Sequence, residues 1–450
     1  MKGGAEEADF ERKIALHPGR EIPRKMLSNP PCEAMSTELA SHQMKTWHDG
    51  WRSSVLLYIV APISVVSCSS VPSSTGSESA SKSGVGKEAE GFLGIFTHTV
   101  HKLPHGEQVE SLKALLDGNP HIKGATVRLS WQELEPEEGR FNWDGADKMI
   151  AFLESRNMTM ALELFAGWFS PEWIYARGVQ PFEIPDPNPE RPTYGKLMKG
   201  PLPWDETYQK YWKRLVIKVA ERYGHEPLLH DVAVHGHNHR LEMHMGRTPE
   251  LMEKWRKAGW SPELVEQDWK QWIDFFVARF PRPRINIILS RMYDSSTDVV
   301  VERLADYAVA KYPGRILLST HGLQGQRDQY NALHFRIALK HPEVPLAHEL
   351  VGTMENQTEH VAVAQGSLEM TVYNMRLRPP IYIRLWNKES SKSDICARIL
   401  AEYQRASDMT LDAYRQLLVS KGLFREAVAQ SLADEPPRAP VREKAEQQSR

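Results

Sequence analysis

Residues 127–131 read VRLSW and residues 135–144 read EPEEGRFNWD. The first stretch is an apolar strand that ends in Arg128 and Trp131, and the second is a Pro/Gly turn that leads into an aromatic helix start. In a barrel of alternating strands and helices, side chains at the carboxyl ends of strands surround the functional site. Arg128 offers fixed donors and Trp131 a flat apolar face, which together suit a polar ring. The alternative is an ordinary strand, turn and helix with a surface Arg and a core Trp.

Short apolar runs recur after residue 91, separated by amphipathic stretches. They cover residues 92–96, 125–129, 159–164, 231–235, 285–289, 315–319, 345–349 and 381–385. Strands that alternate with helices imply a parallel sheet, and eight such units imply closure. We therefore expect an α/β protein in which residues 91–405 form a single (β/α)₈ TIM barrel. An open doubly wound sheet is the alternative, but residues 94–98 (GIFTH) lack the glycine-rich turn that usually follows its first strand.

Helix and loop signals fit the same scheme. Residues 205–223 place apolar side chains on one face and stop at Gly224, and Ser261-Pro262 opens another helix. Two long loops follow strands. Residues 165–205 hold eight prolines and are expected to form a rigid wall, while residues 236–261 hold a histidine-rich turn and a short helix at 249–258. Residues 406–450 are expected to form a further helix, within 411–433, and a charged tail.

The segment before the barrel resembles a bacterial lipoprotein signal peptide. Residues 44–67 combine a short basic start with an apolar run at 55–66 that is too short to span a membrane. The run ends in VVSC, which resembles a lipoprotein box with Cys68 as the lipidated residue. Residues 68–90 read as a flexible tether, and residues 1–43 as a gene-model extension upstream of Met44. The expected location is the bacterial cell envelope, on a lipid anchor in the membrane.

Composition narrows the choice of partners. The net charge of −2 gives no reason to expect nucleic acid. The three cysteines lie far apart and indicate neither a metal site nor a disulfide framework. Thirteen tryptophans favour carbohydrate, because an indole face stacks on sugars, although tryptophan also packs in cores.

The stretch at 127–144 is similar to the second strand and loop of clan A glycoside hydrolases, the two-glutamate barrels that include β-galactosidases and cellulases. This resemblance implies hydrolysis of a glycosidic bond in a carbohydrate substrate, without a cofactor. In that clan the acid/base glutamate follows strand four and the nucleophile ends strand seven. The resemblance therefore implies Glu349 as nucleophile and Glu242 as acid/base. The family normally has Asn directly before the acid/base, whereas here Asn238 precedes His239.

Other residues at predicted strand ends are candidate substrate ligands. Glycoside hydrolysis needs two carboxyl groups facing one bond, and Glu163 and Glu389 compete for these roles. Aromatic and polar side chains that could bind sugar follow several strands: Trp168 and Trp173 after the third, Tyr293 after the fifth and Trp386 after the eighth, with His98, Arg128, Asn238 and His321 as hydroxyl ligands or orienting groups.

Two alternatives belong to other functional classes. His235, His237 and His239 alternate, so an extended chain would place them on one face, as ligands of a metal-dependent barrel hydrolase require. A barrel that binds carbohydrate without cleaving it is the second alternative, favoured by the departure from the family pattern at Glu242. Analysis of bound metal separates the first from the glycosidase, and sugar binding without turnover separates the second.

Overall fold

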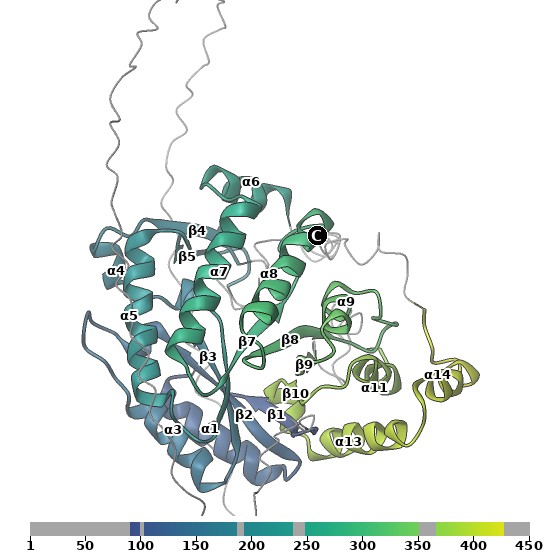
Figure 1. Cartoon of the computed structure of the whole chain (residues 1–450). Coiled ribbons are helices and arrows are strands. Elements are labelled where there is room, and N and C mark those ends of the chain that lie inside the picture. The colour runs from purple at the N-terminus through teal and green to yellow at the C-terminus, as the bar shows by residue number, and fades with distance from the viewer. Residues whose placement is uncertain (1–90, 100–102, 187–192, 237–247, 351–365, 427–450) are drawn as a thin grey trace, which may run out of the picture. The chain divides into compact units, whose positions relative to one another are not determined.

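The computed structural model describes residues 91–99, 103–186, 193–236, 248–350 and 366–426, apart from the side chains of residues 388 and 389. Within these ranges the strands form a closed parallel barrel (Figure 1). In chain order they are β1 (Gly94–His98), β2 (Ile122–Ser130), β3 (Thr159–Phe165), β6 (Leu229–Ala233), β7 (Arg284–Leu289), β8 (Ile316–Leu323), β9 (Leu346–Leu350) and β10 (Tyr382–Leu385). Consecutive barrel strands are neighbours, and β10 pairs with β1. The predicted (β/α)₈ barrel is confirmed.

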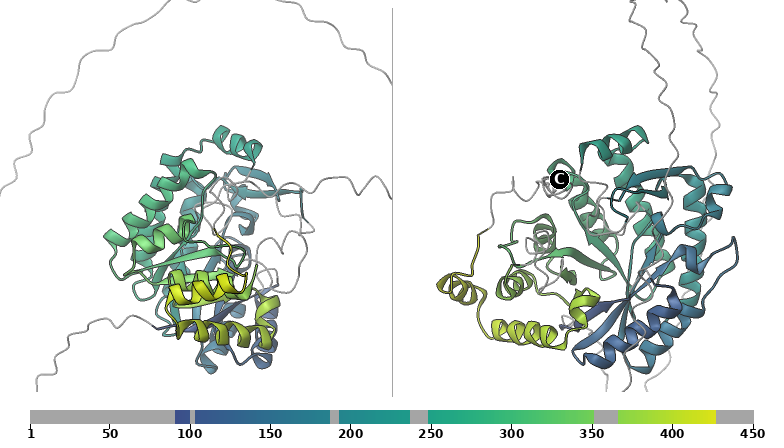
Figure 2. Two further views of the ribbon diagram at one scale, coloured as in Figure 1. Left: turned by 90° about the vertical axis from the view of Figure 1, so that its right-hand side faces the viewer. Right: turned by 180° about the vertical axis from the view of Figure 1, so that it is seen from behind.

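A helix connects each barrel strand to the next and covers the outside of the sheet (Figure 1). These helices are α1 (His105–Gly118), α3 (Asp144–Ser155), α5 (Glu206–Tyr223), α7 (Pro262–Arg279), α8 (Asp298–Lys311), α9 (Leu333–Lys340) and α11 (Leu368–Leu377), and α13 (Ser393–Ser407) follows the last strand. The remaining helical segments are α2 (Trp131–Leu134), η1 (Gly167–Phe169), α4 (Trp173–Ala176), α6 (Pro249–Lys257), η2 (Ser295–Thr297), α12 (Asn387–Ser390) and α14 (Leu411–Ser420). Figure 2 shows α13 and α14 on the flank of the barrel where α11 lies.

The predicted helix boundaries have visible causes. The Asp205 side chain accepts a hydrogen bond from the Tyr208 backbone N–H at the start of α5, which ends before Gly224. Ser261 caps α7 in the same way, and Pro262 occupies the first turn, where its missing N–H costs nothing. No helix in the described part of the chain is long and apolar enough to cross a membrane.

The described residues form three hydrophobic clusters. The large one lies between strands and helices, a small one lies around Phe96 and Tyr382, whose rings stack with centroids 4.2 Å apart, and a third comprises Ala233 and Ile288 with Phe165 against them. Gly124 of the neighbouring strand makes room for this stack, because a Cβ there would lie 2.4 Å from the Phe96 ring. Polar and charged side chains also occupy the barrel interior, which in such barrels is usually filled by branched apolar residues.

The long loop after β3 contains a hairpin that was not predicted. Residues 165–205 were expected to form a rigid wall, and within them β4 (Pro181–Pro185) and β5 (Leu197–Pro201) pair in an antiparallel hairpin. Its Phe182 packs on Trp255 of α6 with ring centroids 4.3 Å apart. The two long loops are therefore joined by an aromatic contact on the side of the barrel where the strands end (Figure 1). The boundaries expected at residues 43, 67 and 90 lie outside the described ranges.

Candidate active site

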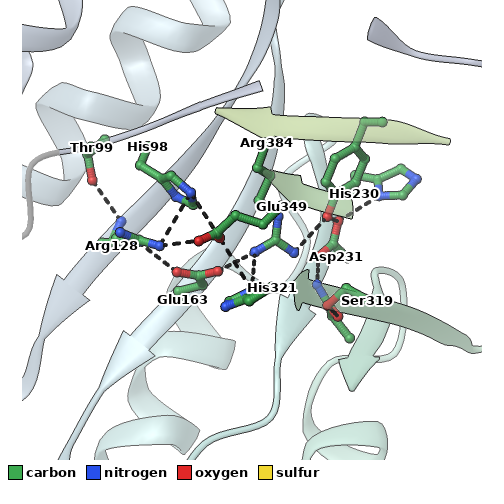
Figure 3. A network of polar contacts seen from close by, with 12 residues as sticks. His98, Thr99, Arg128, Glu163, His230, Asp231, Ser319, His321, Glu349 and Arg384 are labelled. Atoms are coloured by element: carbon green, nitrogen blue, oxygen red, sulfur yellow. Dashed lines mark hydrogen bonds and ion pairs between the residues drawn. The ribbon is translucent and has the colours of Figure 1, made fainter. Parts of the chain in front are cut away.

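Charged and imidazole side chains from neighbouring strands meet inside the carboxyl end of the barrel (Figure 3). The parallel pairing of the strands places these side chains at the same height along the barrel axis, because Arg128 is in register with Glu163 and Glu349 is in register with Arg384. Side chains alternate across a strand, so one residue of each strand projects inward at this height. The cluster comprises His98 of β1, Arg128 of β2, Glu163 of β3, His321 of β8, Glu349 of β9 and Arg384 of β10.

Glu349 lies at the centre of this cluster and is only 4% exposed. Its Oε2 is 3.0 Å from Nε2 of His98 and 3.4 Å from Nε2 of His321. The Arg128 guanidinium is 3.8 Å away. Burial raises the pKa of the Glu349 carboxyl, but His321, His98 and Arg128 lower it by more, so that its pKa lies well below the usual range. Glu349 is therefore an ionised carboxylate with a fixed orientation.

Glu163 is a second buried carboxylate in the cluster, and each of its two oxygens accepts a hydrogen bond from an arginine. Nε of Arg128 donates to its Oε2 at 2.8 Å, and Nη1 of Arg384 donates to its Oε1 at 2.5 Å. Burial raises the pKa of Glu163, but Arg128 and Arg384 together hold the pKa at about 2. A carboxyl group with this pKa carries no proton near neutral pH, so Glu163 cannot serve as the general acid for which it was a candidate.

His98 connects the cluster to the rim of the barrel. Burial first, and then the positive charge of Arg128, lower its pKa to about 4, so the ring is neutral near pH 7. A neutral ring can donate from Nε2 to Glu349 while Nδ1 stays unprotonated, and among the described residues Nδ1 has no hydrogen-bond partner. The side-chain amide of Asn387 donates to the His98 carbonyl oxygen at 2.6 Å.

A column of polar contacts continues from Arg384 down the barrel interior (Figure 3). Nη2 of Arg384 donates to the Tyr382 hydroxyl at 3.2 Å, and that hydroxyl donates to Oδ2 of Asp231 at 3.0 Å. The other Asp231 oxygen accepts from the Asn286 amide at 2.9 Å, whose oxygen accepts from Ser319 at 2.7 Å. The buried guanidinium of Arg384 is thus paired with Glu163 on one side and oriented by the Tyr382 hydroxyl on the other.

Trp386 is an exposed aromatic residue beside the Glu349 cluster. Its side chain follows β10 and is 44% exposed, and its ring lies edge-on to His98 with centroids 6.3 Å apart. Trp168 lies in η1, partly buried against the core. Tyr293 follows β7, and its ring lies beneath the Arg256 guanidinium of α6 at 5.9 Å. Trp386 is therefore the clearest platform for a ring, at the edge of the Glu349 cluster.

Two aromatic residues expected near the ligand have structural roles instead. Trp131 is fully buried, and its indole N–H donates to Glu135 at 3.0 Å. Trp173 packs edge-on against Trp131 and donates to the Glu135 carbonyl oxygen at 3.0 Å. The interpretation of Trp131 and Trp173 as sugar ligands was wrong. Trp131, in α2 directly after β2, and Trp173, in α4 after β3, pack their rings against each other in the outer core, whereas Arg128 points inward.

Several predicted site residues lie outside the described ranges. They include Asn238 and Glu242, the side chain of Glu389, the lipidation residue Cys68, and two of the histidines proposed as metal ligands, His237 and His239. His235 is described. It is buried, with its Nδ1 2.5 Å from the Leu164 carbonyl oxygen. Gly236 has a φ of +119°, so the extended run assumed for the three histidines does not hold at that residue.

Sequence reasoning missed Arg384 and the residues beneath it. The sequence did contain a signal for these residues, namely polar side chains within otherwise apolar strands. Tyr382 and Arg384 alternate in one strand, and Asp231 lies in another. Such spacing points both side chains of a strand to the same face. In a closed barrel that face is the interior, where an unpaired charge is too costly to be retained.

Residues 120–273 match the family model Glyco_hydro_42, described as beta-galactosidase. The matched region is less than half of the chain, but it runs from β2 to α7 and so includes Arg128 and Glu163. The match bears out the expected reaction class, hydrolysis of a glycosidic bond. None of the curated proteins compared with the chain matches it.

Solved structures of glycoside-cleaving enzymes resemble the barrel at low sequence identity. The catalytic domain of a beta-amylase from Paenibacillus polymyxa has 11% identity and a TM-score of 0.47, covering 66% of this chain and 92% of that one. A beta-galactosidase from the psychrophilic Marinomonas ef1 has 13% identity and a TM-score of 0.41, covering 72% and 61%. At these TM-scores the resemblances say nothing about the substrate of this chain.

Proposed function

We propose that this protein is a retaining glycoside hydrolase in which Glu349 is the nucleophile. The observation that carries the proposal is the state of Glu349, a buried carboxylate kept ionised by His98, His321 and Arg128 at the carboxyl end of the barrel. A nucleophilic carboxylate must be unprotonated and held in one orientation, and the contacts of Glu349 support both conditions. Glu163, the other carboxylate of the cluster, is neutralised by two arginines and does not compete.

In the proposed reaction Glu349 attacks the anomeric carbon, and Glu242 protonates the leaving oxygen. The glycosyl–enzyme ester is then hydrolysed by water that Glu242 deprotonates. Arg128 and Asn238 hold the sugar and the nucleophile, and Trp386 supports the ring. Retention requires the two catalytic carboxyl groups to stand about 5 Å apart. The assignment of Glu242 rests on its position in the sequence after the fourth barrel strand, and on the exclusion of Glu163 as an acid.

The substrate proposed is an oligosaccharide or polysaccharide with a terminal or internal pyranose. The family model matched by residues 120–273 is described as beta-galactosidase, so aryl β-galactosides are the first substrates to test. Aryl glucosides, xylosides and mannosides complete the panel. The hairpin β4–β5 and helix α6 are the parts of the described chain best placed to limit substrate length.

The test is turnover of this panel by the wild type, Glu349→Gln and Glu242→Gln. Loss of the nucleophile should abolish turnover of every glycoside. Loss of the acid should spare aryl glycosides with good leaving groups and depress those with poor ones. Glu343→Gln is the matched control, since its side chain is 63% exposed on the loop before β9. Wild-type turnover that survives in Glu349→Gln contradicts the assignment, and sugar binding without any turnover favours a binding barrel.

The proposal includes attachment to the bacterial cell envelope through Cys68. It is supported by the basic and apolar segments before that residue and the serine-rich residues after it. Cys68→Ala should move the protein from the membrane fraction to the soluble fraction when the full gene is expressed in a bacterium. A variant that stays with the membranes contradicts the lipoprotein interpretation.

A further inference from the structure

A buried arginine inside a barrel needs a reason, because barrel interiors are usually filled by apolar side chains. Arg384 is 1% exposed, and Glu163, to which it is paired, is equally buried. Removing two charges from water costs several kcal/mol per ion, and a buried pair often contributes no more to stability than apolar residues of the same volume. The pair is therefore weak evidence for a purely structural role.

The contacts of Arg384 point to the site instead. Its Nη1 donates to Glu163 and lies 3.2 Å from Nε2 of His321, the same imidazole nitrogen that approaches Glu349 at 3.4 Å. Glu163 in turn holds Nε of Arg128, whose Nη2 faces Glu349. Arg384 thus touches one neighbour of Glu349 directly and fixes a second through Glu163.

The lower half of the guanidinium is fixed as well. Tyr382 lies two residues earlier on the same strand, and its hydroxyl accepts from Nη2 and donates to Asp231. A planar guanidinium held at both ends has one orientation, which an ammonium group would not have. This distinguishes Arg384 from a charge that merely balances Glu163.

We infer that Arg384 is a positioning residue for Glu349: oriented from below by Tyr382 and Asp231, it holds Glu163 and His321 in place beside the nucleophile. The inference rests on the proposed function for its catalytic meaning, but the coupling between Arg384 and Glu349 exists with or without turnover. Among the described residues, His98, Arg128, His321 and Arg384 act electrostatically on Glu349, and Glu163 lies between the two arginines.

The first test is the pH profile of kcat/KM on the best aryl glycoside, between pH 3 and pH 8. The pKa of Glu349 lies well below the usual range in the wild type, so wild-type activity should persist towards the acidic end of this interval. Arg384→Met removes a positive charge near Glu349, so the acidic limb of the variant should lie about one pH unit or more above that of the wild type. At pH 6, kcat should fall by roughly tenfold or more with KM little changed, because the effect is on the nucleophile. Arg378→Met is the matched control. Arg378 is partly buried, and it donates to backbone carbonyls such as that of Pro342 rather than to a carboxylate.

A purely structural role predicts lower thermal stability in both variants and an acidic limb at the wild-type pH in both. If Arg384→Met does not fold, Arg384→Lys takes its place. A lysine keeps the charge but cannot reach Glu163, His321 and Tyr382 together, so the acidic limb should stay in place while kcat falls. Wild-type kcat and KM in Arg384→Lys would overturn the positioning role.

The second test needs no turnover. Urea unfolding at pH 7 of the wild type, Arg384→Met, Glu349→Gln and the double variant forms a double-mutant cycle. The expected coupling is roughly tenfold in the unfolding equilibrium constant, within the range for residues that share one buried network. Additive effects overturn the inference. An inactive wild type that still shows the coupling rejects the proposed function and leaves the positioning role standing.

Discussion

Acid should destabilise this protein through His348, the residue that precedes Glu349 in β9. His348 faces the opposite side of the strand, is 1% exposed, and lies against Phe335 with ring centroids 5.2 Å apart. Its Nε2 is 3.3 Å from the Arg378 carbonyl oxygen. Burial lowers the pKa of His348 to about 3, with the hydrogen bond to that carbonyl opposing the shift in part.

The magnitude follows from the difference between the folded and unfolded pKa values. A histidine in the unfolded chain titrates near 6.5. The folded state binds a proton less readily, so this contribution to stability is complete above pH 6.5 and is lost as the pH falls towards 3. At pH 5 the loss is roughly 2 kcal/mol, and at pH 4 roughly 3 kcal/mol. The lowered pKa values of Glu163 and Glu349 act only at lower pH, since their stabilisation is lost below about 4.5.

The assay is urea unfolding at half-unit steps between pH 5 and pH 7.5 for the wild type and His348→Gln. The variant loses packing at every pH, but its free energy of unfolding should fall by roughly 2 kcal/mol less over this interval. His225→Gln, an exposed position after α5, is the control and should keep the wild-type slope. Equal slopes in the wild type and His348→Gln would refute the assignment of the acid sensitivity to this buried ring.

Three further outcomes are expected. Asp268→Asn should raise the free energy of unfolding at pH 8 by roughly 2–4 kcal/mol, because burial raises the pKa of Asp268 to about 7 although the Gln209 amide donates to it. The gain should shrink as the pH falls towards 4, and pH-dependent unfolding measures it. Trp386→Ala should raise KM for an aryl glycoside by roughly tenfold with the melting temperature nearly unchanged, in line with about 1–2 kcal/mol for a stacking face; unaltered steady-state kinetics would place the sugar elsewhere. Gly124→Ala should cost roughly 1–3 kcal/mol in urea unfolding, because its Cβ would strike the Phe96 ring, and a neutral effect would contradict the tight interior stack.

The barrel could be predicted because its signals are local. Each barrel strand is a short apolar run, and each large helix has an apolar face with polar ends. The period and spacing of the apolar residues therefore indicate that strands alternate with helices. Glu349 could be placed at a strand end by the same reasoning, and Arg128 likewise. The hairpin β4–β5 was missed because its strands are short, rich in proline and paired only with each other, which leaves little periodic signal.

The order of strands and helices, their approximate bounds and the residues at the strand ends can be read from the sequence, because these features depend on contacts between near neighbours. The sequence also indicated the reaction class, through the stretch at 127–144. Which strand-end residues share a site depends on the folded barrel. Trp131 and Arg128 are three residues apart, yet one turns outward into the core and the other inward to Glu349. Arg384 and Glu163 are 221 residues apart and form one ion pair. Barrel closure decides such pairings, because only when β10 joins β1 do the two ends of the chain's sheet face one another across the interior.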